Sequence, residues 1–406
     1  MNLLEHKKGR ALLVFALYLS EGAPIGFIWW AMPTILRNEG VKIEIITSLV
    51  AILVLPWVFK FLWAPLVDSL RSSRYGFKTW IFGSQILMGA ALVPLIFISP
   101  VGHLGYWTFF LVLHAMAAAT QDVSIDAMVI NVVAEKERGI LNGYMQAGML
   151  TGRSVFGGGA LWMVSQMGLP PVIILLIISV FITMILLAFV KEPTYIKVVE
   201  SRVGNFITNL KESFNKKNTW LAILFALTGA AAFESAGALA GPFLIDINVS
   251  EESIGFFYAI PVVAAMLIGG FAGGKISDRF SREKSVGIFL SGFVFFVAII
   301  SLLMIFNKNT DPIIYFIGFG LMYLFVGAFT ASSYALFMDL TNPKLGATQF
   351  STYMAATNGC EAWAVWAAGR MTGLWDYPYA FLVMCGVSLL SLIFLYLMQE
   401  GKYFRK

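Results

Sequence analysis

A small set of ionisable side chains stands inside the long apolar runs of this sequence. The carboxylates are Glu21, Asp122, Asp126, Glu234 and Glu361, and the most central cation is Arg153. A charged side chain in the middle of an apolar helix costs at least about 2.5–3.5 kcal/mol. We therefore expect these residues to take part in binding or in the movement of ions.

Two of the carboxylates, Glu21 and Glu234, have no obvious cationic partner at their depth in the apolar runs. A low-dielectric environment favours the neutral form of a carboxyl group, which can then exchange a proton near neutral pH. We predict that Glu21 or Glu234 carries a proton, with Glu21 favoured, and that Asp126 and Glu361 are the next candidates. The alternative is a neutral Glu that is hydrogen-bonded within the packing.

Asp122 and Arg153 lie at similar depths on neighbouring runs. With a rise of ~1.5 Å per residue, they lie about 18 Å and about 20 Å from the ends expected to face the cytoplasm. An ion pair would lower the cost of burying either charge alone. We predict a cavity ion pair that opens during function; a permanent bridge between helices is the alternative.

Aromatic and sulfur side chains complete the inventory of reactive groups. Trp363 and Trp366 lie on the same run as Glu361, close to it in sequence, and could stack on an organic solute. Cys360 and Cys385 lie in separate apolar runs, and the 3 histidines form no metal-binding pattern. No nucleophile–base arrangement or phosphate-binding loop is present, so we expect no metal, no cofactor and no catalytic residues.

The elements that position these side chains are long apolar helices. Apolar residues make up 59% of the 406 residues and charged residues only 13%, against about 45–50% and about 25% in soluble domains. Runs long enough to span a bilayer predict an all-α integral membrane protein of twelve transmembrane helices. The runs cover residues 11–34, 45–66, 78–99, 105–134, 140–166, 171–190, 219–245, 253–273, 285–306, 312–338, 345–372 and 377–398.

The distribution of basic residues predicts the orientation. If both termini are cytoplasmic, most of the 28 Lys and Arg residues face the cytoplasm, and only Arg37, Lys42 and Lys308 face the opposite side. This agrees with the positive-inside rule. Because the basic residues stand at the ends of apolar runs, the net charge of +5 does not indicate a nucleic-acid partner.

The longest hydrophilic stretch, residues 191–218, divides the chain into two predicted six-helix bundles, residues 1–190 and 219–406. Glu21 and Glu234 recur at nearly the same interval as Asp68 and Asp278. This weak internal repeat predicts duplicated bundles related as parallel repeats.

A charged loop motif supports that architecture. The segment from Gly274 to Lys284 contains Asp278, Arg279 and Arg282, and it resembles the loop signature of the major facilitator superfamily. A looser copy holds Asp68 and Arg71. In that superfamily such clusters latch the two halves together, and the alternative reading is a loop that only sets topology.

Three further segments resemble the AmpG-like branch of the superfamily: Lys60–Asp68 (KFLWAPLVD), Ala119–Ala127 (ATQDVSIDA), and Glu137–Gly139 followed by Gly152 and Arg153. That branch contains muropeptide permeases, siderophore permeases and acetyl-CoA transporters. The resemblance implies functional roles for several positions, with Lys60 and Asp68 beside the latch and Gln121 as a contact for substrate. These positions are Lys60, Asp68, Gln121, Asp122, Asp126 and Arg153.

The resemblance implies a secondary transporter of the bacterial inner membrane that imports a muropeptide-like or siderophore-like solute with protons. AmpG proteins usually carry a longer C-terminal region with extra helices, whereas we expect twelve helices here, and residues 75–78 read Tyr-Gly-Phe-Lys in place of a basic stretch. Both departures keep a siderophore or another organic anion open as the substrate. The alternatives are an efflux transporter of the same fold and, with less support, a membrane-embedded acyltransferase. The expected partners are a small organic substrate, protons and the bilayer, and we expect a monomer.

Overall fold

Helices account for all the regular structure in the part of the chain that the computed structural model describes. The described residues are 2–64, 67, 76–132, 135–192, 214–307, 311–341 and 346–403. Ten helical stretches among them are long and apolar enough to cross a membrane. Two further helical stretches of similar length, 135–167 and 346–375, are more polar than these ten. With them the number of long helical stretches in the described residues is the twelve that the sequence predicts.

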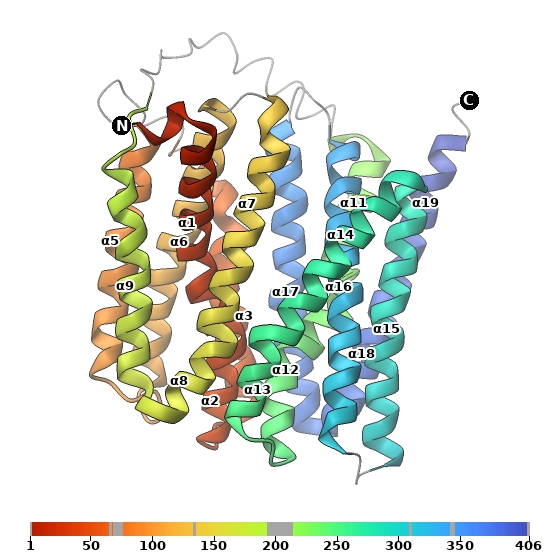
Figure 1. Ribbon diagram of the computed structural model, residues 1–406. Helices are drawn as coiled ribbons and strands as arrows, with labels where there is room; N and C mark the ends of the chain where they lie inside the picture. The colour runs from red at the N-terminus through yellow and green to blue at the C-terminus, as the bar shows by residue number, and fades with distance from the viewer. Residues whose placement is uncertain are drawn as a thin grey trace. The chain divides into compact units, whose positions relative to one another are not determined.

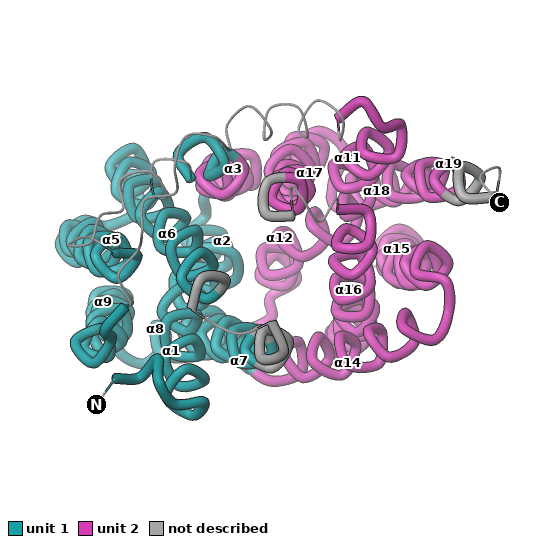
Figure 2. The backbone as a smooth tube through the Cα atoms, turned by 90° about the horizontal axis from the view of Figure 1, so that it is seen from above, with its two compact units in different colours: residues 1–41, 59–198, 250–259 teal, residues 42–58, 199–249, 260–406 magenta. Residues whose placement is uncertain are grey.

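The chain divides into two compact units, shown in different colours in Figure 2. Unit 1 holds residues 1–41, 59–198 and 250–259, and unit 2 holds residues 42–58, 199–249 and 260–406. This division differs from the predicted bundles in two segments, because 42–58 packs with the second half and 250–259 with the first. Most of the predicted linker, residues 193–213, lies outside the described residues.

Unit 1 is built on helices that pack side by side along their lengths. The helix α1 packs against α7 and α9, while α5 packs against α6 and α9 (Figure 1). The elements of this unit are η1 (Leu3–Glu5), α1 (Lys7–Gly26), η2 (Phe27–Ala31), α2 (Met32–Asn38), η3 (Lys60–Leu62), α5 (Phe77–Leu92), η4 (Val93–Ile96), α6 (Leu104–Val132), α7 (Glu135–Arg153), η5 (Ser154–Gly158), α8 (Gly159–Met167), α9 (Leu169–Leu187) and α13 (Glu251–Phe257).

Unit 2 repeats part of this packing scheme. The helix α15 packs against α16 and α18, as α5 packs against α6 and α9 in unit 1. Its elements are α3 (Ile43–Phe59, of which the last residue falls in unit 1), α11 (Lys217–Thr228), α12 (Ala231–Asp246), α14 (Val263–Arg279), α15 (Arg282–Phe306), α16 (Pro312–Leu340), α17 (Gly346–Trp375), α18 (Tyr377–Leu390) and α19 (Leu392–Tyr403). The π-helical segment η6 (Tyr258–Val262) continues α13 into α14.

Polar residues set the helix boundaries. Asp311 accepts a hydrogen bond from the backbone N–H of Ile313 at 2.9 Å and is followed by Pro312 at the first position of α16. Asp376 plays the same part at α18, where its carboxylate accepts from the N–H of Tyr377 at 2.8 Å. Such caps satisfy N–H groups that have no partner inside the helix.

Glycines allow α1 and α7 to touch along their backbones. A Cβ atom built on Gly22 would lie 2.2 Å from the carbonyl oxygen of Met149, and one on Gly148 would lie 2.2 Å from that of Phe15. One on Gly152 would lie 2.5 Å from the oxygen of Leu19. The small-residue spacing of α7 therefore serves close helix approach.

Candidate functional site

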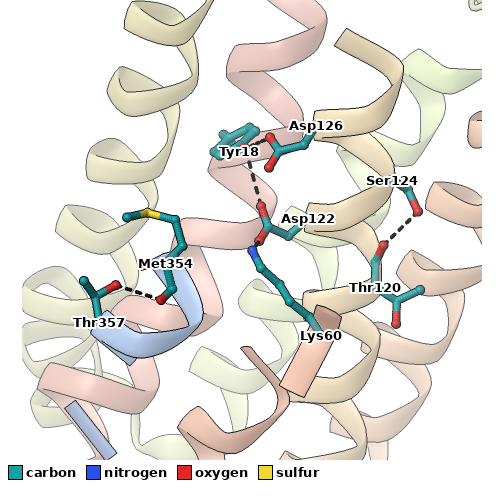
Figure 3. Close-up of polar contacts among 8 residues, drawn as sticks. All are labelled: Tyr18, Lys60, Thr120, Asp122, Ser124, Asp126, Met354 and Thr357. Carbon is teal, nitrogen blue, oxygen red and sulfur yellow. Dashed lines mark hydrogen bonds and ion pairs between the residues drawn. The ribbon is translucent and has the colours of Figure 1, made fainter. Parts of the chain in front are cut away.

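Four polar side chains meet in the interior of unit 1: Tyr18, Lys60, Asp122 and Asp126 (Figure 3). Tyr18 comes from the middle of α1, and the two aspartates lie one turn apart on α6. Lys60 begins the short 3-10 helix η3, which follows α3. We call these four residues the Lys60 cluster.

The contacts in the Lys60 cluster connect all four side chains. The ammonium group of Lys60 forms an ion pair with Oδ2 of Asp122. The hydroxyl group of Tyr18 lies 2.6 Å from Oδ1 of Asp126 and 3.4 Å from Oδ1 of Asp122. Tyr18 therefore donates mainly to Asp126 and bridges the two carboxylates.

The cluster carries an excess of acidic groups. Lys60 is its one cation, against two carboxylates, and Glu21 on α1 is also buried, with 2% of its surface exposed. The side chains of Lys60 and Asp122 are 15% and 10% exposed. The carboxylates of the cluster are thus held together with little water to screen their mutual repulsion.

Beside the Lys60 cluster lies a second buried network, which connects α1, α5, α6 and α9. The amide nitrogen of Gln85 donates to Oγ1 of Thr183 at 3.0 Å, and that of Gln121 lies 3.3 Å from Oγ of Ser20. Gln121 has no exposed surface. The structure therefore places this predicted substrate contact inside the packing of unit 1, where it supports Ser20.

The sequence led us to expect an ion pair between Arg153 and Asp122. In the structure Asp122 pairs with Lys60 instead. The sequence gives the position of each cation along its helix but not the neighbour that its side chain faces. Arg153 is the last residue of α7, a helix that packs on α1, and a Cβ atom on Gly26 of α1 would lie 2.6 Å from its Cα atom. Within the described residues, Arg153 has no ion pair or hydrogen bond, and its Nε atom is buried.

The predicted site residues of the second half lie in unit 2. Glu234 on α12 and Glu361 on α17 are both partly buried. The indole nitrogen of Trp363 donates to the carbonyl oxygen of Leu227 at 2.7 Å. Trp366 is 48% exposed, and the guanidinium group of Arg370 lies 5.9 Å from its ring centroid.

The predicted latch is described only in unit 2. Arg282 contacts Asp278 at 3.0 Å and Asp339 at 2.5 Å, which joins the ends of α14, α15 and α16. Among the described residues the side chain of Arg279 makes no hydrogen bond or ion pair, and its role stays a prediction. Asp68 and Arg71 lie outside the described residues.

Sequence reasoning missed several members of these networks, among them Tyr18, Gln85 and Asp339. Tyr18 and Gln85 are single polar groups in apolar runs, and such residues are common in helix packing. Asp339 had a detectable signal, because it follows Asp126 by the same interval that separates Glu21 and Glu234. It is therefore the repeat counterpart of Asp126.

The family model of the major facilitator superfamily matches residues 11–264 and again residues 232–403. The chain belongs to the major facilitator superfamily. The two overlapping matches agree with the internal repeat. The charged loop of α14 and α15 and the AmpG-like segments of the first half are thus features of a facilitator chain.

Curated relatives narrow the position within the superfamily. The chain is 25% identical over 411 residues to the putative transporter AmpG 4 of Rickettsia conorii, covering 95% of this chain and 96% of the relative. It is 26% identical over 400 residues to the anhydromuropeptide permease of Escherichia coli K12, covering 95% of this chain and 79% of the permease. The facilitator chain is therefore AmpG-like.

Solved structures share the fold. A D-xylose–proton symporter superposes with a TM-score of 0.78 at 11% identity, covering 95% of this chain and 96% of the symporter. A bacterial homologue of the lysosomal transporter Spinster, in an inward-facing state, gives 0.69 at 15% identity, covering 96% and 94%. The protein is a secondary transporter of small molecules and a multi-pass protein of the bacterial inner membrane.

Proposed function

We propose that this facilitator imports an anhydromuropeptide-type solute together with protons, by alternating access. The observation that carries the proposal is the Lys60 cluster, in which two carboxylates share one ammonium group and one hydroxyl group inside unit 1. A proton carrier needs an acid that is neutral in the dry state and charged when water reaches it. A crowded, buried carboxylate meets that need.

Asp126 is the member of the cluster best suited to change its charge. Lys60 is held by Asp122, so Asp126 has the hydroxyl group of Tyr18 as its hydrogen-bond donor. A hydroxyl group stabilises a carboxylate less than an ammonium group does. Glu21, buried one turn beyond Tyr18, is the second carrier that we propose.

The substrate and the direction rest on likeness to relatives. Similarity over nearly the whole chain to an anhydromuropeptide permease supports a muropeptide-type solute. A siderophore-type anion is the competing substrate from the same branch. The same similarity favours uptake over efflux as the direction of transport.

The test is transport by the purified chain in liposomes with an imposed pH gradient, acid outside. We expect radiolabelled anhydromuropeptide to accumulate inside and the accumulation to vanish with a protonophore. A siderophore that accumulates in its place would change the substrate, and outward movement with the gradient would indicate efflux. Uptake that ignores the gradient would overturn proton coupling.

The carriers are tested by Asp126→Asn and Glu21→Gln, which fix the neutral form. Each should abolish gradient-driven accumulation while leaving substrate exchange partly intact, because exchange needs no net change in protonation. Glu252→Gln, at an exposed position on α13, is the matched control. If both variants still accumulate substrate, coupling lies elsewhere, with Glu234 and Glu361 next in line.

A further inference from the structure

Arg153 stands deep within its membrane-spanning stretch. The stretch runs from Glu135 at the start of α7 to Met167 at the end of α8. With a rise of ~1.5 Å per residue, Arg153 lies about 27 Å from the first of these residues and about 21 Å from the second. Such a depth places its guanidinium group far from lipid headgroups at either surface.

No group in the described chain balances this charge. Arg153 has no hydrogen bond, ion pair or ring contact there, and its Nε atom is buried without a hydrogen-bond partner. The nearest expected partner, Asp122, belongs to Lys60. An unbalanced guanidinium group at this depth costs several kcal/mol, which an anionic ligand would offset.

The backbone holds Arg153 in a fixed place while its side chain stays partly exposed. Its Cα atom packs against Gly26 of α1, so closely that a Cβ atom there would lie 2.6 Å away. The next residue, Ser154, opens the π-helical segment η5, and its hydroxyl group donates to the carbonyl oxygen of Ala259 at 2.6 Å. Segments of π-helix are frequent at functional sites.

We propose that Arg153 binds a carboxylate group of the transported solute. The planar guanidinium group can donate two parallel N–H···O hydrogen bonds to a carboxylate, a geometry that a lysine cannot reproduce. Lys60 cannot take this part while it pairs with Asp122. The inference rests on the proposed function for the identity of the solute, because the peptide portion of a muropeptide ends in a carboxylate.

The experiment measures binding to the purified, full-length protein. The probes are anhydromuropeptide as the free acid and as its methyl ester, in which the carboxylates are neutral. We expect wild-type protein to bind the acid at least about tenfold more tightly than the ester, as a charge-assisted bond of ~1.5–3 kcal/mol implies. Arg153→Gln should remove this preference without weakening the ester, and Arg153→Lys should keep part of it.

Arg370→Gln is the control, since Arg370 is also a cation within a span but lies over Trp366. It should keep the full preference for the acid. The inference is overturned if wild-type protein binds the acid no better than the ester or binds neither, if Arg153→Gln keeps the preference, or if that variant weakens both probes equally. Failure of proton-driven accumulation with acid-selective binding intact would overturn the proposed function alone.

Discussion

A single tyrosine hydroxyl group joins the two aspartates of α6. Tyr18 lies 2.6 Å from Asp126 and 3.4 Å from Asp122, and it has one proton to donate. When Asp126 is charged, the proton of Tyr18 points to it. Once Asp126 is protonated it needs no donor, and Tyr18 can turn toward Asp122 and compete with Lys60. The hydroxyl group thus connects the charge of one aspartate to the ion pair of the other.

Replacing Tyr18 with Phe removes only this hydroxyl group. Loss of a hydrogen bond to a charged group is worth about 1.5–3 kcal/mol, so gradient-driven uptake should fall about 10- to 100-fold. The fall should depend on pH, because the connection matters only while Asp126 changes its charge. Tyr106→Phe on α6, where the side chain is 62% exposed, is the control. Equal loss at every pH would leave Tyr18 with a packing role only.

The ion pair of Asp122 is tested by a double-mutant cycle on uptake. Asp122→Asn and Lys60→Gln should each impair transport, and the double variant should do better than additivity predicts by about 0.5–3 kcal/mol. The same cycle with Arg153→Gln in place of Lys60→Gln should be additive. Coupling of Asp122 to Arg153, with none to Lys60, would contradict the geometry found here.

At the scale of elements, close backbone contact limits what α1 and α7 tolerate. Gly152 faces the backbone of α1, where a Cβ atom would lie 2.5 Å from both the nitrogen of Ala23 and the oxygen of Leu19. Gly143 lies on the same helix with nothing within 4 Å of such an atom. The two glycines therefore separate the effect of crowding from the effect of helix propensity.

Gly152→Ala should destabilise the protein by about 1–3 kcal/mol through overpacking. Gly143→Ala should leave stability unchanged or raise it by up to about 1 kcal/mol, because alanine favours helix more than glycine does. Thermal unfolding in detergent measures both. A drop for Gly143→Ala as large as that for Gly152→Ala would mean that α1 and α7 do not approach through Gly152.

The sequence predicted elements better than partners. The bilayer sets the length of the apolar runs, so the long helices could be predicted from the pattern alone. Asp122 could be predicted to be buried because it lies inside one of these apolar runs. Its partner could not, because the sequence does not show how α6, α7 and η3 pack, and that packing decides whether Lys60 or Arg153 faces Asp122.

At the scale of the whole molecule, the two units have different interiors. The Lys60 cluster gives unit 1 a charged interior. In unit 2, Phe329 packs against Phe225 and Phe293, with ring centroids 6.2 and 5.2 Å apart, and Phe225 also packs against Phe337. Within the described residues, the repeat therefore duplicates the helices, while the buried Lys60–Asp122 ion pair belongs to the first copy.

The predicted orientation can be tested by cysteine labelling, since Cys360 and Cys385 are both buried. Lys216→Cys introduces an exposed thiol in the predicted linker, and Glu39→Cys introduces one between α2 and α3. We expect a membrane-impermeant maleimide to label Glu39→Cys in intact spheroplasts. It should label Lys216→Cys only after the membrane has been permeabilised. The reverse pattern would invert the topology.

The exchange of segments between the units has a consequence for synthesis. The helix α13 completes unit 1 by packing against α8, where a Cβ atom on Gly255 would lie 2.7 Å from the carbonyl oxygen of Gly158. The ribosome makes α13 only after the predicted linker, and α3 waits for α17 in the same way. Unit 1 therefore cannot finish folding until α13 has been inserted, and its early helices must remain in the bilayer as an unfinished bundle until then.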